Sequence, residues 1–182
     1  MRTFLLDIME KNMEIRLAEK SDLSTLEAMF DDIIKTMNKN GIFIWNKYYP
    51  FEEYEHDIQK GRLYILTDNQ NIVSVFALTT EIQGGDCFSW QNNNAKAMYI
   101  AKLGVNTNYT HKGFGSKTLQ KAMQICKQKN IDYLRLTVAE ENTPAINLYL
   151  KNNFIKVNGL FQKYSESLSK TINEIGFEIQ IK

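Results

Sequence analysis

The sequence predicts an α/β protein built on a mixed central β-sheet of about seven strands, with helices on both faces. Helical and β-branched segments alternate along the chain, yet several strand segments are joined by turns too short for a crossover helix. The segment Ala97–Val105 is apolar almost without interruption, as in strands that lie inside a sheet and are covered on both faces. Together these observations favour a sheet that combines antiparallel and parallel neighbours.

The first half of the chain is expected to supply three strands and two helices. Glu14–Leu17 alternates polar and apolar residues, as a half-buried strand does. Apolar residues recur at helical spacing over Leu26–Met37, and a second, charged helical segment spans Phe51–Lys60. Two β-branched runs, Leu63–Thr67 and Ile72–Thr80, are separated by four polar residues and therefore predict a hairpin.

The second half is expected to alternate strands and helices before it ends in a strand pair. Apolar spacing predicts the first of these helices, and a threonine followed by proline predicts the start of the second, because proline in the first helical turn loses no hydrogen bond. The predicted elements are, in order, strand Ala97–Val105, helix Gly115–Lys129, strand Tyr133–Val138, helix Thr143–Asn152, and strands Phe154–Lys163 and Ile172–Ile181.

The length of 182 residues fits one domain with one core. We expect residues 13–182 to form it and residues 1–12 to be an N-terminal extension, because Met13 could itself start a chain whose first residues form a strand. The N-terminal apolar stretch is too short for a signal peptide, and no run approaches the length needed to cross a membrane. A cytoplasmic protein without a membrane partner is therefore expected.

Charge and cysteine content exclude several functions. The formal net charge is +1, which argues against a general nucleic-acid-binding protein because such proteins need a basic surplus. Cys87 and Cys126 form no disulfide framework, and no histidine pair or second cysteine stands near either of them, so no metal is expected. Cys126 falls on the apolar stripe of a predicted helix and is expected to be a buried thiol.

The strongest functional signal follows the central strand, between Val105 and Thr118. There a strand ends, a glycine-containing loop turns and an amphipathic helix begins. Unpaired amides at a helix start, together with glycines that allow close approach, can hold a phosphate group. His111, Lys112 and Lys117 add donors or positive charge. The alternative is an ordinary turn and helix cap without a ligand, because such turns are common.

Two common phosphate motifs do not fit this segment. The Walker A pattern fails because Ser116 separates Gly115 from Lys117. The dinucleotide-binding pattern fails because Thr118 stands where its third glycine belongs. A nucleotide-binding or phosphotransfer domain is therefore disfavoured.

The segment Thr110–Gly115 instead resembles the [QR]-x-x-G-x-[GA] motif of the GNAT (GCN5-related) N-acetyltransferases, with threonine in place of the usual Gln or Arg. Asn142–Phe154 resembles a second motif of that family, N-x-x-A-x-x-L-Y-x-x-x-G-F, and departs from it at Asn153, a residue that tolerates the left-handed conformation. The resemblance runs from about residue 14 to 159. Trp45, Tyr49 and Pro50, with Trp90, resemble an uncharacterised bacterial branch of the family.

The resemblance implies the GNAT acyl-CoA N-acyltransferase fold and acetyl-CoA as the co-substrate. In that fold the strand Ala97–Val105 splays away from Tyr133–Val138, and the pantetheine arm lies in the gap. Tyr149 would protonate the departing CoA thiolate. The residues implied in cofactor binding are Leu103, Gly104, Val105, His111, Lys112, Gly113, Phe114, Gly115, Ser116 and Asn142.

The resemblance says less about the residues that would bind the amine acceptor. Trp45, Tyr49 and Trp90 could line an acceptor pocket, or could equally belong to the core, and Glu81 is a further candidate. Glu81, Glu52 or an ordered water could act as the general base. The resemblance implies acetyl transfer to a primary amine of a small molecule or protein, by direct attack in a ternary complex. The alternative is a non-catalytic module that binds acyl-CoA. A homodimer is left open.

Overall fold

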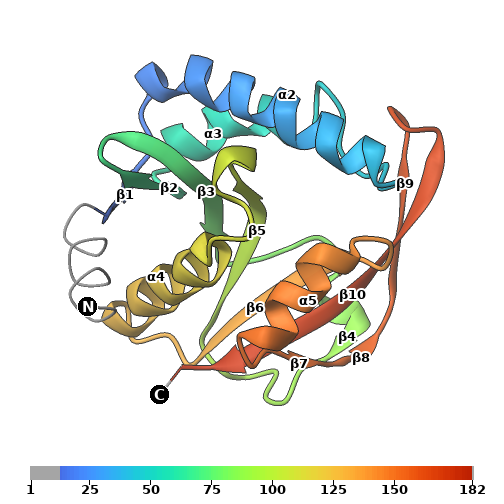
Figure 1. Ribbon diagram of the computed structural model, residues 1–182. Helices are drawn as coiled ribbons and strands as arrows, with labels where there is room; N and C mark the ends of the chain where they lie inside the picture. Colours follow the sequence, from blue (N-terminus) through green and yellow to red (C-terminus); the bar gives the residue numbers. More distant parts are fainter. Residues whose placement is uncertain (1–12, 182) are drawn as a thin grey trace.

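A computed structural model describes residues 13–181 of the protein (Figure 1). The predicted extension over residues 1–12 lies outside the described residues. The structure has a twisted mixed sheet with two helices on each face, so the predicted fold class is confirmed.

The main sheet follows one path with a side branch. Along the path, every neighbouring pair for which pairing is described is antiparallel except β5 and β6, which are parallel. The strands in spatial order are β1 (Met13–Leu17), β2 (Leu63–Asp68), β3 (Asn71–Thr79), β5 (Ala97–Val105), β6 (Tyr133–Ala139), β10 (Lys170–Gln180) and β7 (Ile155–Lys156), with β9 (Phe161–Ser165) also paired to β10.

The predicted strand Phe154–Lys163 is broken into pieces. Between β7 and β9 the chain forms β8 (Asn158–Gly159), which pairs with β4 (Phe88–Ser89) in a separate two-stranded sheet. Gly159 has a φ of 128°, and a Cβ there would collide with the carbonyl of Cys87. The local approach to β4 therefore bends the chain away from a single continuous strand.

Within residues 13–181, the α-helices divide between the two faces of the sheet, as Figure 1 shows. Helices α2 (Leu23–Lys39) and α3 (Tyr54–Gln59) cover β1, β2 and β3 on one face. Helices α4 (Phe114–Gln128) and α5 (Thr143–Lys151) cover the opposite face of the central strands. The predicted helix Phe51–Lys60 is shorter than expected, because its first turn is a 3-10 turn.

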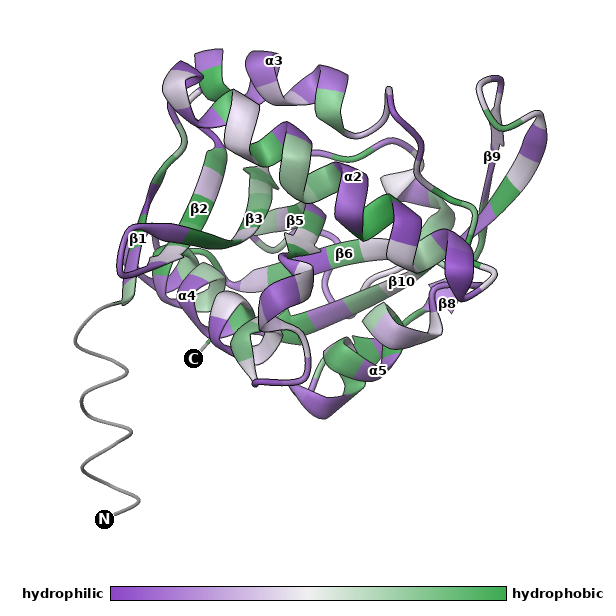
Figure 2. Ribbon diagram, turned by 45° about the horizontal axis from the view of Figure 1, so that its top comes forward, coloured by the Kyte–Doolittle hydropathy of each residue, from purple (hydrophilic) through white to green (hydrophobic). Residues whose placement is uncertain are grey.

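Hydrophobic residues recur along the strands and along the helices that cover them (Figure 2), and their side chains form buried clusters between the helices and the sheet. Phe30, Tyr54 and Ile65 lie in the core under α2 and α3. Leu119 and Cys126 lie in the core under α4, and Cys126 is fully buried. The prediction of a buried free thiol is thus confirmed.

The two central strands pair over only part of their length. Ala97–Tyr99 pairs with Tyr133–Arg135, and no pairing between β5 and β6 is described beyond it. On the other side of β5, Gly104 lies opposite Val75 and Ala101 opposite Ala77, so β5 carries one extra residue over this stretch. Such a bulge bends a strand. The predicted splay between the central strands is therefore confirmed.

Candidate active site

A pocket of about 490 Å³ opens where β5 and β6 diverge. Residues 100–103 of β5 and Thr137–Ala139 of β6 form its two walls, and Asn142, Ala145 and Tyr149 of α5 line it as well. On the far side it is lined by residues from the loop after α2 and from the hairpin between β9 and β10. That volume is within the range of small-molecule binding pockets.

The start of α4, which follows β5 in the chain, has the features of an anion-binding site. Gly113 precedes the helix with a φ of 83°, which glycine adopts without strain. The amide of Lys117 is bonded to the Gly113 carbonyl at 3.1 Å, so the three amides before it begin the helix without an intrahelical acceptor. Free amides and the positive end of the helix dipole together favour a bound anion.

The loop before α4 is fixed by short-range hydrogen bonds. The Asn106 amide group donates to the carbonyl of Ile72 at 3.0 Å, and its carbonyl oxygen accepts from the Asn108 amide at 3.0 Å. The Thr110 hydroxyl donates to the Thr107 carbonyl at 2.9 Å. Thr110, which stands where the family's motif has Gln or Arg, thus stabilises the conformation of this loop. The backbone amides at the start of α4 stay in place.

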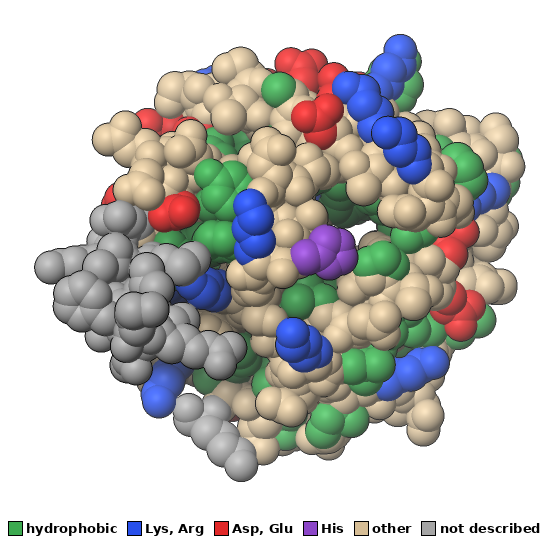
Figure 3. Space-filling view, viewed as in Figure 1, with side chains coloured by type: hydrophobic (Ala, Val, Ile, Leu, Met, Phe, Trp, Pro, Cys, Tyr) green, Lys and Arg blue, Asp and Glu red, His purple; other side chains and the backbone are tan. Residues whose placement is uncertain are grey.

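Positive side chains surround this loop. Lys112 Nζ donates to the Asn108 carbonyl at 2.9 Å, and Lys117 Nζ lies 5.3 Å from the centre of the Phe114 ring. His111 has a left-handed φ of 59° and is exposed. Figure 3 shows a hollow near the centre of this face, with a histidine and several Lys or Arg side chains around it.

Helices α4 and α5 approach each other closely at Gly115. A Cβ at this position would lie 3.0 Å from the Leu148 side chain, so only glycine fits without a shift. Nearby, the Asn152 side chain donates to Ser116 Oγ at 2.9 Å. Asn153 then adopts the left-handed conformation, with a φ of 64°, as its place in the motif predicts. Residues of the second motif (Asn142–Phe154) therefore pack against the start of α4 and position the first motif (Thr110–Gly115).

Tyr149 and Asn142 both combine a structural contact with a place in the pocket lining. The Tyr149 ring packs between Phe154 and Phe177 and is only 6% exposed. Its hydroxyl has no hydrogen-bond partner among residues 13–181, and burial raises its pKa well above the ordinary value. Asn142 caps α5 by accepting a hydrogen bond from the Ala145 amide at 3.3 Å.

Trp45 and Tyr49 both line the pocket. Trp45 also packs on Phe30, with ring centres 5.2 Å apart, so it belongs to both the pocket and the core. Lys163 Nζ lies 5.3 Å from the centre of the Tyr49 ring. Burial raises the pKa of the Tyr49 hydroxyl well above its ordinary value, and the negative charge of nearby Glu53 raises it further.

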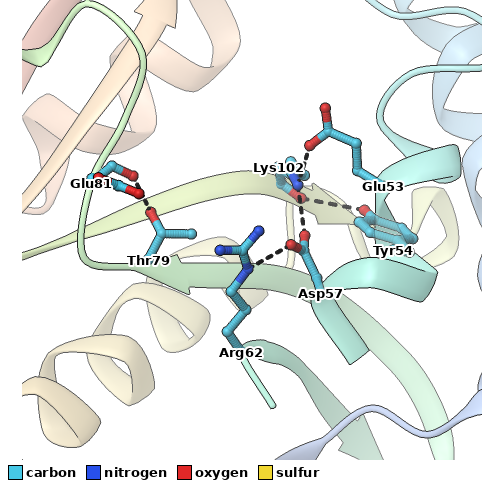
Figure 4. Close-up of polar contacts among 7 residues, drawn as sticks. All are labelled: Glu53, Tyr54, Asp57, Arg62, Thr79, Glu81 and Lys102. Carbon is cyan, nitrogen blue, oxygen red and sulfur yellow. Dashed lines mark hydrogen bonds and ion pairs between the residues drawn. The ribbon is translucent and has the colours of Figure 1, made fainter. Parts of the chain in front are cut away.

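The structure places Trp90 and Glu81 away from this pocket. Trp90 is buried against Phe88 and Tyr99, and its indole N–H donates to the Gly85 carbonyl at 2.8 Å. Glu81 is exposed, and its recorded contact is made by its backbone carbonyl, which accepts from Thr79 Oγ1 at 2.8 Å (Figure 4). The geometry brings neither residue to the acceptor side.

The pocket contains charged residues that the sequence did not single out. Glu174 lines it, and its carboxylate accepts a hydrogen bond from Thr137 Oγ1 at 2.7 Å. Lys102 and Lys163 line it as well, and so does Glu52, one of the two carboxylates named as a general base. Glu174 lies beyond residue 159, where the family resemblance ends, and so no motif pointed to it.

Among residues 13–181, none of the helices has the length and apolar character needed to cross a bilayer.

Known structures share this architecture. A GNAT-family acetyltransferase from Streptococcus agalactiae is 15% identical, with 93% of this chain and 95% of that chain covered and a TM-score of 0.76. The protein yncA from Salmonella typhimurium, solved with its cofactor acetyl-CoA, is 13% identical, with coverages of 94% and 95% and a TM-score of 0.61. At these identities the likeness concerns the fold.

A third similar structure is the ribosomal-protein-S18-alanine N-acetyltransferase from Escherichia coli, at 17% identity, coverages of 93% and 94%, and a TM-score of 0.61. No curated protein sequence matches this chain. The model of the acetyltransferase (GNAT) family, however, matches residues 27–154, which is more than half of the chain and includes both motifs. The chain belongs to the GNAT acetyltransferase family.

Proposed function

We propose that this protein transfers an acetyl group from acetyl-CoA to a primary amine of a small molecule or protein. The observation that carries the proposal is the continuity of one pocket with the gap between β5 and β6, beside the amide-bearing start of α4. Membership of the family and the acetyl-CoA complex of a similar fold support it. The similar Escherichia coli enzyme is an N-acetyltransferase, which agrees with an amine acceptor.

In this proposal the pyrophosphate of CoA sits on the amides of residues 111–116, with Lys112 and Lys117 nearby. The pantetheine arm runs along the free side of β5, where the backbone of Leu103 and Val105 can bond its amides. Gly104 contributes backbone only, because its Cα faces Phe30 and Ile33 at close range. Asn142 keeps an amide group beside the gap while its oxygen caps α5.

The chemistry is a direct attack within a ternary complex. The neutral amine forms the new C–N bond as the C–S bond of the thioester breaks, and holding the two partners together supplies much of the rate. The amine's proton passes to a carboxylate or a water on the acceptor side, where Glu52 and Glu174 lie. The Leu103 amide can stabilise the oxyanion that develops on the thioester oxygen.

Tyr149 is assigned to the departing thiolate. Of the residues that the second motif contributes to the pocket lining, Tyr149 carries the one weakly acidic hydroxyl. Because burial raises its pKa, the phenol stays protonated at neutral pH and can donate a hydrogen bond to the sulfur as negative charge develops there. A general acid of this kind contributes roughly 10²–10⁴-fold to a rate.

The proposal is tested by free-thiol release from acetyl-CoA in the presence of primary amines, after calorimetry has established binding. Amine-dependent thiol release supports the enzyme. Binding without thiol release across amines of small molecules and of peptide N-termini would favour the acyl-CoA-binding module instead, which the altered first motif at Thr110 also suggests. No binding at millimolar acetyl-CoA would contradict both.

A further inference from the structure

A buried ion-pair network lies directly behind the bulge in β5. The Lys102 side chain is only 7% exposed, and its ammonium group lies 2.6 Å from Asp57 Oδ2 and also pairs with the Glu53 carboxylate. The Asp57 side chain is fully buried and receives a second cation, Arg62 Nε, at 2.7 Å. Figure 4 shows the side chains of Lys102, Glu53 and Arg62 converging on this cluster.

The backbone at Lys102 is also unusual. Its φ is 56°, in the left-handed region that a lysine side chain disfavours. Lys102 and Leu103 together lie opposite the single residue Phe76 of β3, so Lys102 belongs to the bulge itself. The Tyr54 hydroxyl donates a long hydrogen bond of 3.4 Å to the Lys102 carbonyl. A strained backbone of this kind persists only where its surroundings hold it.

The network joins this bulge to another element. Tyr54 and Asp57 belong to α3, and Glu53 immediately precedes that helix. Lys102 and its neighbour Leu103 both line the pocket. Because a carboxylate buried with its cations has few alternative arrangements, the network holds Lys102 in one position relative to α3.

We propose that the ion pair between Lys102 and Asp57 positions β5 for acetyl-CoA, by holding the bulge that bends its C-terminal end away from β6. Lys102 is a positioning residue in this account, acting through the backbone of Leu103. The inference rests on the proposed function in taking acetyl-CoA as the molecule that fills the gap. It explains why a lysine occupies a buried, left-handed position in a strand that is otherwise apolar.

The test compares wild-type protein with Lys102→Met, which removes the charge but keeps an unbranched side chain. Glu55→Gln serves as the matched control, because Glu55 is on α3 but pairs with Lys20 at the surface. Two quantities are measured well below the unfolding temperature: the Kd for acetyl-CoA by calorimetry, and amide hydrogen exchange over residues 100–105 in the protein without ligand.

We expect Lys102→Met to speed exchange over residues 100–105 and to weaken acetyl-CoA binding by roughly 10-fold. We expect Glu55→Gln to leave both quantities unchanged and Lys102→Arg, which retains the charge, to restore affinity to near that of wild type. Unchanged exchange over residues 100–105 and a Kd within about twofold of wild type in folded Lys102→Met would overturn the inference.

If Lys102→Met does not fold, Glu53→Gln replaces it. That variant removes only the more exposed of the two carboxylates that pair with Lys102. We expect exchange over residues 100–105 to speed up again, but by a smaller factor. Unchanged exchange in Glu53→Gln would then overturn the inference. Failure of the wild-type protein to bind acetyl-CoA would instead contradict the proposed function. The exchange measurement, made without ligand, would still test whether Lys102 holds the bulge in β5.

Discussion

At the scale of single residues, Tyr149 joins the core to the pocket. Its ring is packed among aromatic side chains of the core, while its hydroxyl has no protein partner among the described residues. Removal of the hydroxyl alone therefore leaves the packing intact and separates the proposed chemical role from the structural one.

We predict that Tyr149→Phe lowers turnover by about 10²-fold while the Kd for acetyl-CoA stays within about twofold. Steady-state thiol release measures the first quantity and calorimetry the second. Tyr64→Phe is the matched control, because Tyr64 stacks on Phe76 and does not line the pocket, and it is expected to keep full activity. Equal turnover in wild type and Tyr149→Phe would rule out the proposed role of the phenol.

The pair formed by Arg16 and Asp22 makes stability depend on pH. Two hydrogen bonds from Arg16, of 2.8 and 2.7 Å, hold the pKa of Asp22 below its ordinary value of 3.8. A carboxyl whose pKa is lower in the folded state stabilises the fold above its unfolded pKa, and this stabilisation is lost as the pH falls through the folded pKa.

We therefore predict that Arg16→Met reduces the free energy of unfolding by about 1 kcal/mol at pH 7. The difference from wild type should shrink as the pH falls from about 4 through the lowered pKa of Asp22 in folded wild type, because protonation of Asp22 removes the charge that Arg16 stabilises. Urea unfolding at pH 7, 4 and 3 measures it. A difference that stays constant over this range would show that the pair does not act through the charge of Asp22.

At this scale, sequence and structure agreed where spacing along one element determines neighbours. Asn142 and Tyr149 both line the pocket, because a helical motif fixes which residues share a face. For Trp90 a pocket and a core position were both open, and the structure places it in a buried cluster; Glu81 does not line the pocket. Lys102 and Glu174 reach the pocket through a bulge and through pairing of distant strands, which local sequence does not encode.

At the scale of elements, the contact between α4 and α5 determines where the helix start points. Gly115 allows the close approach, and Gly113 supplies the turn before the helix. The two glycines differ in their surroundings, because a Cβ at Gly113 would meet no atom within 4 Å whereas one at Gly115 would meet Leu148. Substitutions at these two positions should therefore have different effects.

We predict that Gly115→Val lowers the free energy of unfolding by about 1–3 kcal/mol, because its side chain must displace Leu148. Gly113→Val has open space for its side chain but must adopt a positive φ that valine disfavours, so it should distort the turn beside the first amides of α4 and weaken acetyl-CoA binding. Chemical unfolding and calorimetry on both variants measure these effects. Unimpaired acetyl-CoA affinity in Gly113→Val would reject the proposed cradle.

The order of the elements followed from the sequence because hydrophobic period and turn residues are local signals. The division of the last strand region did not follow from it. Gly159 was inside a predicted strand, and only its contact with the distant residue Phe88 shows why the chain bends there. The pairing of β4 with β8 is likewise a long-range feature with no local signature.

At the scale of the whole molecule, helices on both faces of the sheet leave the two cysteines in different surroundings. Cys87 is exposed, and Cys126 is buried between α4 and the sheet, where burial raises the pKa of its thiol to about 11. A thiol reagent reacts with the thiolate and needs access to it. The packing of the fold thus predicts two different reactivities.

We predict that one thiol per chain reacts rapidly with Ellman's reagent in the native protein and that the second reacts only after unfolding. Cys87→Ser should abolish the rapid phase, and Cys126→Ser should leave it unchanged. Absorbance after mixing, with and without denaturant, measures both. Rapid reaction of two thiols in the native state would contradict the packing of α4 on the sheet.

The gap between the central strands opens into one pocket, and the start of α4 follows β5 in the chain; that one acetyl-CoA spans both is the central claim. Titration of the wild-type protein with acetyl-CoA in a calorimeter tests it most directly. We predict saturable binding of one acetyl-CoA per chain, strongly weakened in Gly113→Val. The absence of any binding heat at millimolar acetyl-CoA across several temperatures, with the protein folded, would contradict the account.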